Sequence, residues 1–495
     1  MTLSHVLPRQ LHPSPISLAG LPDPRDAPFI ALARYAGCPV ITGNVKHFPG
    51  GSGSRGVDAG GVAGGAGKRL IEGSPRWVII THIMADNHPR WLTARIDDAL
   101  SDTPVVLLNG ARQTGKSTLA QAVSDARGGR YLTLDNPTVL AAARADPLAF
   151  ASTGAALTVI DEVQKAPGLF AAIKHTVDRN RQPGRFLLTG SADVLMLPNV
   201  SESLAGRMEV LSLQPLAQGE IARQASDLIE RLFANAPPVT VLRAPADASE
   251  STLARRIGAG GFPEALSRIR TERRLAWFSA YVTTVTQRDV RDLSNIADTS
   301  ALPRLLALLA ARSGGLTNMA ELARSCALPQ ATLQRYLALL QATFLYQPLP
   351  AWHANLGKRL IKAPKAYLLD SGLACALCGI GSATLPASPL YGAMLEGFVL
   401  GELRRIAAAM PTPPGIFHYR SAGGVEVDFV IEDAAGRCIA IEVKASTSLG
   451  DKHFGGLKDL QAALGERFCC GVVLYGGEQQ VRFGERLWAV PVGGK

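Results

Sequence analysis

Residues 105–123, which read VVLLNGARQTGKSTLAQAV, decide the fold of this chain. An apolar run typical of a buried strand is followed by Gly110 and Gly115, then by Lys116 and Ser117, and then by helix-forming residues. The glycines allow backbone N–H groups to curl around phosphates at a helix N-terminus, which favours anions. Lys116 can then reach the β- and γ-phosphates of a nucleotide, and Ser117 can ligate Mg²⁺. The sequence therefore predicts a P-loop, with the nucleotide-binding candidates Gly110, Thr114, Gly115, Lys116, Ser117 and Thr118.

Two further apolar runs are predicted to bring polar residues to the same edge of a parallel sheet. The run 157–160 delivers Asp161 and Glu162 at its carboxyl end, and the run 185–188 is followed shortly by Ser191. Ligands of such sheets bind beyond the carboxyl ends of the strands. We expect Asp161 to hold Mg²⁺ through water and Glu162 to orient or deprotonate the attacking water. Ser191 would sense the γ-phosphate, as sensor 1 does in AAA-type ATPases.

One arginine is a candidate for stabilising charge on the transferred phosphate. Arg207 lies in SLAGRMEVLSLQPL at residues 203–216 and could act as an arginine finger or charge sensor. The alternative is an ordinary surface arginine. Both interpretations stay open, because the sequence does not show which way the side chain points.

Length and composition limit the class of protein. The 495 residues suggest about three domains of roughly 150 residues each. Apolar residues make up 47% and charged residues 19%, which excludes global disorder. No run approaches the roughly 20 apolar residues of a membrane-spanning helix, so no membrane partner is expected. The seven cysteines are irregularly spaced and no signal-peptide pattern is present, which favours a reduced, cytoplasmic protein. A net charge of +10 favours polyanionic partners such as nucleic acid.

A glycine-rich stretch separates a short N-terminal piece from the rest. Residues 50–73 read GGSGSRGVDAGGVAGGAGKRLIEG, and such a composition indicates a flexible linker, which we place over residues 50–83. Met84 would be a natural start for the remainder of the chain.

The N-terminal piece, residues 1–49, contains DPRDAPFIALARYAGCPVITGNVKHFPG, which predicts a helix, a turn and a strand. Over residues 20–50 it resembles the C-terminal end of a PIN ribonuclease domain. Asp26 matches a late acidic position of that family, and Asn44 stands where the family often has Asp or Asn. Because the earlier strands and carboxylates of a PIN domain are missing, we interpret the piece as a remnant of a neighbouring gene or as the product of a wrongly assigned start.

Two modules are predicted between the nucleotide site and the C-terminal region. Residues 226–300 predict a helical lid, and residues 301–350 have the rhythm of a winged helix-turn-helix. The second helix of such a motif, here expected over 329–341, can enter the major groove of DNA. Only one of its candidate contacts is basic, so a protein–protein or intramolecular role is equally open. The candidate contacts are Gln330, Thr332, Gln334 and Arg335.

The C-terminal region, residues 351–495, is predicted to be an α/β unit with a second acidic site. A hairpin is expected in which Asp428 lies on the first strand, and Glu442 and Lys444 project from one side of the second. The apolar residues expected to alternate with Asp428 are Val427, Phe429 and Ile431.

An Asp on one strand and Glu-x-Lys on its partner form the constellation of PD-(D/E)xK nucleases. Asp428 and Glu442 could share one or two Mg²⁺ ions, and Lys444 could orient or stabilise the nucleophile. Glu396, on the preceding predicted helix, could supply an additional carboxylate. The alternative is an ordinary hairpin with exposed alternating charges.

Many sequence blocks occur in order between about residues 88 and 480. They are GARQTGKSTL, LTVIDEVQ, FLLTGSAD, SLAGR, GGFPEA, RDVRDL, KRLIKAPKAYLLDSGLA, LEGFVLGEL, EVDFVIE and IEVKAS. In these blocks the chain resembles a family of prokaryotic AAA-type ATPases that carry a C-terminal domain of unknown function. The resemblance implies an ATPase core, which we place over residues 84–225, then a winged helix and a restriction-endonuclease-like domain. It carries nucleotide-binding roles onto Gly110, Gly115, Lys116, Ser117, Asp161 and Ser191, and nuclease-type roles onto Asp428, Glu442 and Lys444.

The sequence therefore predicts an α/β protein that binds ATP and Mg²⁺ and hydrolyses ATP. Its C-terminal domain is expected to be a metal-dependent nuclease acting on DNA or RNA, and a homo-oligomer is a further expectation. Two alternatives stay open. One is a nucleotide-gated regulatory switch with a catalytically idle C-terminal domain, and the other is a DNA-binding regulator that uses the winged helix.

Overall fold

A computed structural model describes residues 40–42, 78–80, 88–152, 154–191, 204–236, 238, 242–243, 253–290, 300–421 and 423–494. The chain divides into two compact units, Met1–Asn87 and His88–Lys495. In the first unit, β1 (Val40–Thr42) and β2 (Val78–Ile80) pair in parallel. The rest of the predicted PIN-like fragment and of the predicted linker lies outside the described residues.

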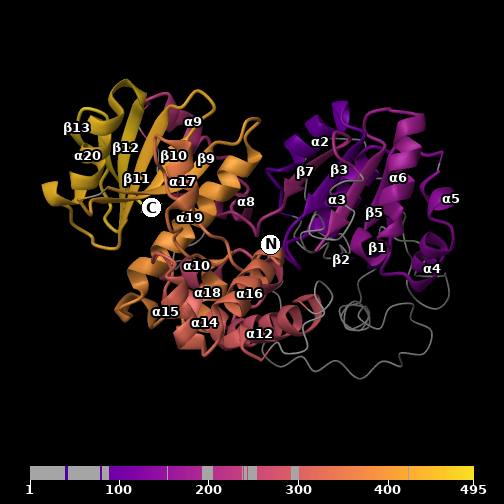
Figure 1. The fold of residues 1–495 in the computed structure, drawn as a ribbon, viewed down its shortest axis with the longest axis horizontal. Helices are drawn as coiled ribbons and strands as arrows, with labels where there is room; N and C mark the ends of the chain where they lie inside the picture. Colours follow the sequence, from indigo (N-terminus) through magenta and orange to yellow (C-terminus); the bar gives the residue numbers. More distant parts are fainter. Residues whose placement is uncertain are drawn as a thin grey trace, which may run out of the picture. The chain divides into compact units, whose positions relative to one another are not determined.

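The second unit begins with a five-stranded parallel sheet of order β4-β5-β6-β3-β7 (Figure 1). Every residue of β3, β5 and β6 is buried, because helices cover both faces of the sheet. Burial on both faces explains why these strands appear in the sequence as continuous apolar runs. The strands are β3 (Val105–Asn109), β4 (Arg130–Thr133), β5 (Thr158–Asp161), β6 (Phe186–Gly190) and β7 (Met208–Ser212).

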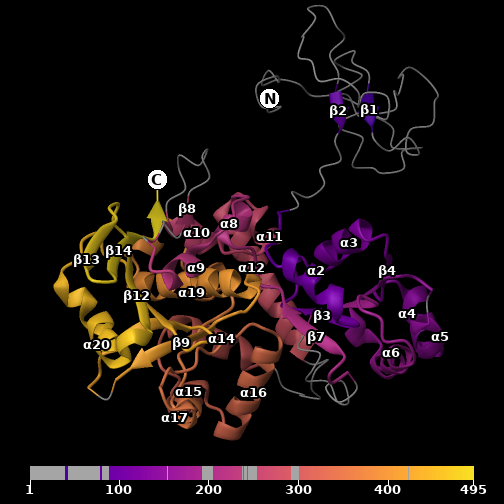
Figure 2. The same ribbon diagram turned by 90° about the horizontal axis from the view of Figure 1, so that it is seen from above.

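Consecutive residues of β3 enter two different cores. Val106 and Leu108 pack with α2 (Thr93–Asp102) and α3 (Lys116–Ala126). Val105 and Leu107 pack with α4 (Pro137–Ala145), α5 (Pro147–Ala151) and α6 (Gly168–Arg179). Figure 2 shows α2 and α3 on one side of the strands and α6 on the other. The predicted order of strand, P-loop and helix is confirmed within an α/β fold.

The middle of the chain is helical. A single cluster of buried side chains includes residues from the predicted lid, from the predicted winged helix and from residues 366–407. Isolated bridges join Leu349 to Lys365 and Tyr346 to Leu368, so pairing crosses the boundary that we predicted at residue 350. The helices are α9 (Leu228–Phe233), α10 (Leu253–Ala259), α11 (Pro263–Leu266), α12 (Thr271–Thr284), α14 (Leu302–Ala311), α15 (Met319–Cys326), α16 (Gln330–Ala342), α17 (Leu356–Ile361) and α18 (Ser371–Leu377).

A buried carboxylate, Asp370, joins segments that are far apart in the sequence. Gly260 has φ +68°, and a Cβ atom there would lie 2.0 Å from Asp370 Oδ1, so only glycine fits at this close approach. Arg405 of α19 (Tyr391–Ala409) lies 3.7 Å from Asp370 and donates to Glu402 at 2.8 Å. Glu402 also accepts from the backbone N–H of Gln218 at 2.9 Å, so a hydrogen bond joins α19 to a segment just after the first sheet.

The chain ends in a six-stranded mixed sheet of order β13-β14-β12-β11-β10-β9 (Figure 1). Helix α19 packs on one face, and α20 (Gly455–Leu464) packs on the other. Strands β9, β10 and β11 are antiparallel, whereas β11, β12 and β14 are parallel. The strands are β9 (Gly415–Arg420), β10 (Glu426–Glu432), β11 (Cys438–Lys444), β12 (Phe468–Tyr475), β13 (Val481–Gly484) and β14 (Leu487–Pro491).

The predicted alternation of β10 is wrong at one point. Val427 packs in the α20 cluster, whereas Phe429 and Ile431 pack in the α19 cluster. The pairing of β10 with β9 shifts register between Val427 and Val430, as at a β-bulge. A bulge bends the strand and re-aims side chains, and bulges are common beside functional sites. Here the break in alternation falls at Asp428.

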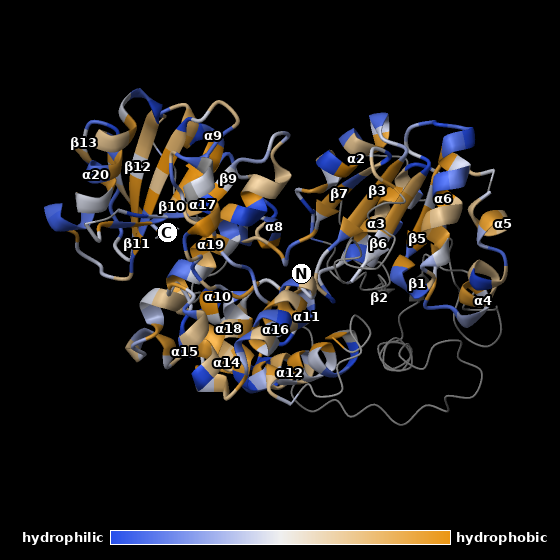
Figure 3. Cartoon of the chain, in the orientation of Figure 1, coloured by the Kyte–Doolittle hydropathy of each residue, from blue (hydrophilic) through white to orange (hydrophobic). Residues whose placement is uncertain are grey.

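Hydrophobic residues are concentrated on the strands of the two larger sheets, as Figure 3 shows. Within the part of the chain that the structure describes, no helix has both the length and the apolar character needed to cross a membrane.

Candidate functional site

The P-loop connects the end of β3 to the start of α3. Gly110 has φ +144°, and a Cβ atom there would lie 2.4 Å from the carbonyl oxygen of Leu213, so the position requires glycine. Gly115, with φ +94°, precedes the first turn of α3. The buried Lys116 donates from Nζ to the carbonyl oxygens of Gly110 at 2.9 Å and Ala111 at 2.7 Å. The loop is therefore a cradle at a helix N-terminus with a lysine folded over it, which suits phosphate.

Asp161 lies at the carboxyl end of β5, where the neighbouring strands also end. Its Oδ1 accepts from Ser117 Oγ at 2.9 Å and from Thr189 Oγ1 at 2.5 Å, and its Oδ2 accepts from Thr133 Oγ1 at 3.2 Å. The structure thus brings Ser117 and Asp161 together as the sequence predicted. A hydroxyl and a carboxylate are ligands that suit Mg²⁺. Burial, followed by the charge of Asp161, raises the pKa of Tyr131, so this neighbouring hydroxyl stays protonated.

Glu162 and Ser191 also meet, as predicted. Ser191 Oγ lies 3.2 Å from Glu162 Oε2, and Gln164 Nε2 donates to both side chains, at 3.0 Å to Ser191. Glu162 has φ 61°, a left-handed conformation that costs a non-glycine residue about 1–3 kcal/mol and is concentrated at functional sites. Gln164 was missed, because one glutamine after a strand carries no signal of its own in the sequence.

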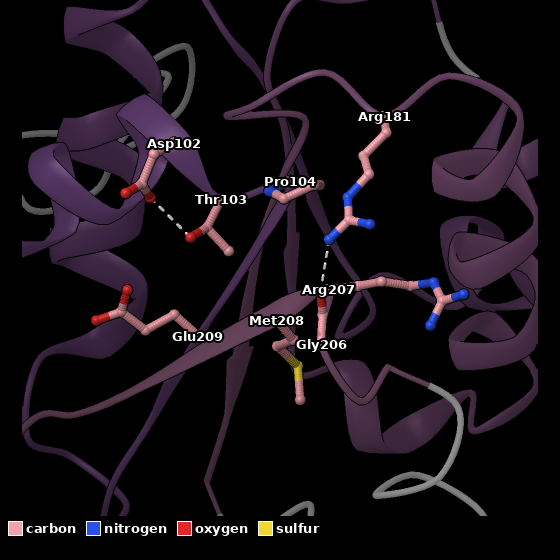
Figure 4. A pocket seen from close by; sticks show the side chains of 8 residues that line it. All are labelled: Asp102, Thr103, Pro104, Arg181, Gly206, Arg207, Met208 and Glu209. Carbon is pink, nitrogen blue, oxygen red and sulfur yellow. Dashed lines mark hydrogen bonds between the residues drawn. The ribbon is translucent and has the colours of Figure 1, made fainter.

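Arg207 lies at the amino ends of the strands, whereas the P-loop lies at their carboxyl ends. Its carbonyl oxygen accepts from Val105 N, at the first residue of β3, whereas the P-loop follows the last residue of that strand. Its side chain is paired with Asp178 of α6 at 2.5 Å and lowers the pKa of that carboxyl. Figure 4 shows Arg207 beside Arg181 in a pocket with the residues 102–104 and 206–209. Arg207 therefore does not face the phosphate site of its own chain.

Thr118, a predicted nucleotide-binding residue, lies on the exposed side of the first turn of α3, and its role stays a prediction.

On α16, the predicted DNA contacts Gln330, Gln334 and Arg335 are exposed, and Thr332 is partly buried. These positions are accessible, and their role in binding nucleic acid stays a prediction.

Arg90 links the P-loop to the rest of the unit and was missed by the sequence analysis. Its guanidinium donates to the carbonyl oxygens of Thr114 at 2.7 Å and Gln214 at 2.5 Å, and to Glu220 at 3.2 Å. Glu220 also accepts from the backbone N–H groups of Trp91 and Ala217. Both side chains of the ion pair are nearly fully buried. Arg90 therefore fixes the P-loop against the segment that follows β7.

We expect Arg90→Ala to lower the free energy of unfolding by about 3–5 kcal/mol, because it leaves the Glu220 charge buried without its partner. It should also weaken ATP binding, because the carbonyl of Thr114 loses its donor. Chemical denaturation and nucleotide titration measure the two effects. Arg127→Ala, which removes a half-exposed ion pair with Asp97, is the control and should cost no more than about 1 kcal/mol. A parent-like stability of Arg90→Ala would contradict this account.

The second acidic site lies where β10 and β11 pair. Asp428 Oδ2 accepts from Val443 N at 2.9 Å, and Asp428 N donates to Glu442 Oε2 at 3.2 Å. Lys444 Nζ lies 2.5 Å from Glu442 Oε1. The predicted trio is thus gathered in space. Burial, with the charge of Asp428 as the second cause, raises the pKa of Glu442 to about 7.

Three further residues complete this site. Glu396 of α19, which the sequence analysis considered, lies 2.9 Å from Lys365 Nζ, and the same ammonium lies 3.2 Å from Asp428 Oδ1. Tyr367 donates a hydrogen bond to Glu396. Lys365 and Tyr367 were missed, because they come from a segment far from the hairpin in sequence. Among the described residues, no three His, Cys, Asp or Glu side chains are grouped so that they could hold a metal ion.

The parallel sheet, the P-loop and the Ser117–Asp161 pair define an AAA-type P-loop ATPase domain. Residues 102–222 match the family described as AAA domain. Residues 250–384 and 391–493 match two domains of unknown function, DUF8612 and DUF4143. The first of these two matches spans the boundary that we predicted at residue 350, in agreement with the shared core.

Two curated proteins, the uncharacterized protein Rv2008c of Mycobacterium tuberculosis and the uncharacterized protein Mb2031c of Mycobacterium bovis, are each 34% identical to the chain over 401 residues. These residues are 80% of this chain and 82% of each relative. The chain therefore belongs to the family of AAA-domain proteins that includes these mycobacterial proteins.

Solved structures are similar at low identity. The Walker-type ATPase PABY2304 of Pyrococcus abyssi is 14% identical, with 59% of this chain and 99% of that chain covered and a TM-score of 0.34. The RuvB Holliday junction branch migration motor of Thermotoga maritima is 17% identical, with 52% and 89% covered and a TM-score of 0.26. Because both scores are low, the class rests on the domain match and on the topology of this chain.

Proposed function

We propose that the chain binds Mg²⁺-ATP, hydrolyses it, and couples this cycle to a metal-dependent nuclease site in its C-terminal domain. The observation that carries the ATPase half is the contact between Ser117 and Asp161 at the mouth of the P-loop, beside the Glu162–Ser191 pair. Lys116 and the N–H groups of the loop would hold the phosphates, and Glu162 would orient the attacking water. We place this activity in the cytoplasm.

The nuclease half rests on the gathering of Asp428, Glu442 and Lys444. Asp428 is buried and Glu442 is partly buried, and two such carboxylates that repel each other suit a divalent cation. Mg²⁺ accepts two protein carboxylates together with water and phosphate oxygens. When bound, such an ion supplies a water of lowered pKa and stabilises charge on the phosphate. Lys444, which donates to Glu442, would orient or stabilise the nucleophile. Nucleic acid is the proposed substrate, in keeping with the net charge of +10.

Helix α19 is the proposed connection between the two sites. It carries Glu396 in the acidic site, and its Glu402 accepts from Gln218 N. Near its C-terminus, the carbonyl of Ala408 accepts from Arg95 of α2 at 3.0 Å. A movement of the ATPase domain that displaces these contacts would therefore shift a helix that reaches the second site.

The test is cleavage of single- and double-stranded DNA and RNA by the purified full chain with Mg²⁺ or Mn²⁺, with and without ATP. Cleavage that depends on ATP supports both halves and their coupling. Cleavage without ATP dependence would leave a nuclease but remove the coupling. No cleavage of any substrate would favour the regulatory switch with an idle C-terminal domain.

We expect the binding of Mn²⁺ to the acidic site to depend on pH. Because the pKa of Glu442 is raised to about 7, the folded site without metal holds a proton on this carboxyl below that pH. Binding must release the proton, so the apparent affinity should fall about tenfold per pH unit below about 7 and level off above it. A nucleotide-free Mn²⁺ titration across this range measures the dependence, with Asp459→Asn, which changes an exposed carboxylate of α20, as the control that keeps it. A flat profile would contradict the proposed role of Glu442.

Arg207 gives a specific reason to consider a homo-oligomer. It lies beside Arg181 (Figure 4), at the end of the strands away from its own P-loop. A role as an arginine finger therefore requires the nucleotide site of a second copy. The accessible positions on α16 favour the other candidate function, a DNA-binding regulator. Binding that weakens steeply with salt and is lost in Arg335→Ala would support that candidate.

A further inference from the structure

Lys365 is a buried lysine placed between two carboxylates of the acidic site. It is 5% exposed, and its Nζ lies 2.9 Å from Glu396 Oε1 and 3.2 Å from Asp428 Oδ1. Its backbone is fixed as well, because its N–H and its carbonyl both exchange hydrogen bonds with Leu349, at 3.0 and 2.9 Å. The main chain therefore fixes where the side chain begins, and the two carboxylates hold its ammonium.

Two carboxylates, Glu396 and Asp428, face the ammonium of Lys365. Tyr367 donates to the same oxygen of Glu396 that faces Lys365. Glu396 thus accepts hydrogen bonds from two protein donors, Lys365 and Tyr367.

Two lysine ammonium groups lie in the site. The Lys365 ammonium lies between Glu396 and Asp428. The Lys444 ammonium lies against Glu442 Oε1, whereas Glu442 Oε2 accepts from the backbone N–H of Asp428. A divalent ion bound between Glu396 and Asp428 would have to share that space with an ammonium, and the repulsion of two cations in a buried site is strong.

We propose that Lys365 is the resident cation of the Glu396–Asp428 pair and excludes a divalent ion from it, so that the acidic site takes at most one metal ion, on the side of Glu442. In this arrangement Lys365 is a positioning residue: it neutralises Asp428 Oδ1 and holds this carboxylate in place. The inference rests on the proposed nuclease function for the metal ion on the Glu442 side. The exclusion of a divalent ion between Glu396 and Asp428 is tested independently of that function.

The experiment counts Mn²⁺ ions bound per chain, without nucleotide, in the full chain and its variants. Lys365→Met keeps most of the length of the side chain and removes the charge, and we expect it to bind one more ion than the parent. Lys365→Arg keeps the charge and should bind the same number as the parent. The double variant Lys365→Met with Glu396→Gln should lose the additional ion, which would place that ion at Glu396. An equal count in Lys365→Met and the parent would overturn the proposal.

A second variant decides the question if Lys365→Met does not fold. Glu396→Gln alone should bind as many ions as the parent, because Glu396 faces a lysine and not a metal. If Glu396→Gln binds one ion fewer, Glu396 ligates metal in the parent and the proposal is wrong, while the nuclease function survives. A different result would separate the two proposals. If Asp428→Asn binds as many ions as the parent, the proposed metal site is wrong. If Lys365→Met nevertheless binds one ion more than the parent, the proposed role of Lys365 is supported.

Discussion

Lys116→Ala is expected to reduce ATP affinity or turnover by about a hundred- to a thousandfold, the cost of removing one preorganised charge from a phosphate-transfer site. The Lys116 ammonium is the cation folded over the P-loop, where it donates to the carbonyls of Gly110 and Ala111. On nucleotide binding it can exchange these carbonyls for phosphate oxygens, which alanine cannot do. Equilibrium binding of a fluorescent ATP analogue and release of inorganic phosphate measure the two quantities.

Lys452→Ala is the matched control for this variant. Lys452 is an exposed lysine in the C-terminal domain, far in sequence from the P-loop. Its loss should leave binding, turnover and melting temperature as in the parent. If Lys116→Ala is folded and hydrolyses ATP at the parent rate, the assignment of the P-loop is wrong.

Asp428→Asn is expected to reduce nucleic-acid cleavage by about a hundredfold or more while leaving ATP turnover unchanged. Asparagine keeps the size of the side chain and can still accept from Val443 N, but it loses the charge that faces Lys365 and that would bind metal. A gel assay of cleavage and a phosphate-release assay, on the same preparation, separate the two activities.

Asp459→Asn is the control, because Asp459 is an exposed carboxylate of α20 in the same domain. It should cleave as the parent does. Cleavage that survives in Asp428→Asn would assign the nuclease activity elsewhere. In that case the Asp428, Glu442 and Lys444 trio would be a feature of the fold and not a working site.

Most residues of the nucleotide site could be predicted, because they lie in one short segment or at the ends of recognisable strands. Gly110 to Ser117 are contiguous in sequence, and the strand before them and the helix after them fix the loop. Asp161 and Ser191 follow from one rule, since the carboxyl ends of parallel strands meet at one edge of the sheet. Arg90 and Gln164 could not be predicted in this way. Neither lies in a patterned segment, and their partners are set by how the chain folds back.

At the acidic site, the sequence predicted the charged residues but not the shape of the strand that carries them. The sequence determined that charged residues would lie on a hairpin, and its spacing brought Asp428, Glu442 and Lys444 together correctly. It did not determine the bulge of β10, because a register shift depends on how β9 pairs with β10, and the expected alternation through Val427 is broken there.

By itself, therefore, the sequence determined the P-loop ATPase domain and the charged residues of the second site. Only the tertiary structure decided where Arg207 points, that the predicted helical modules share one core across residue 350, and that Lys365 meets Asp428 across 63 residues of sequence. The physical reason is the same in each case. Local spacing fixes which residues share a strand edge or a loop, whereas contacts between distant segments depend on packing, which no periodicity encodes.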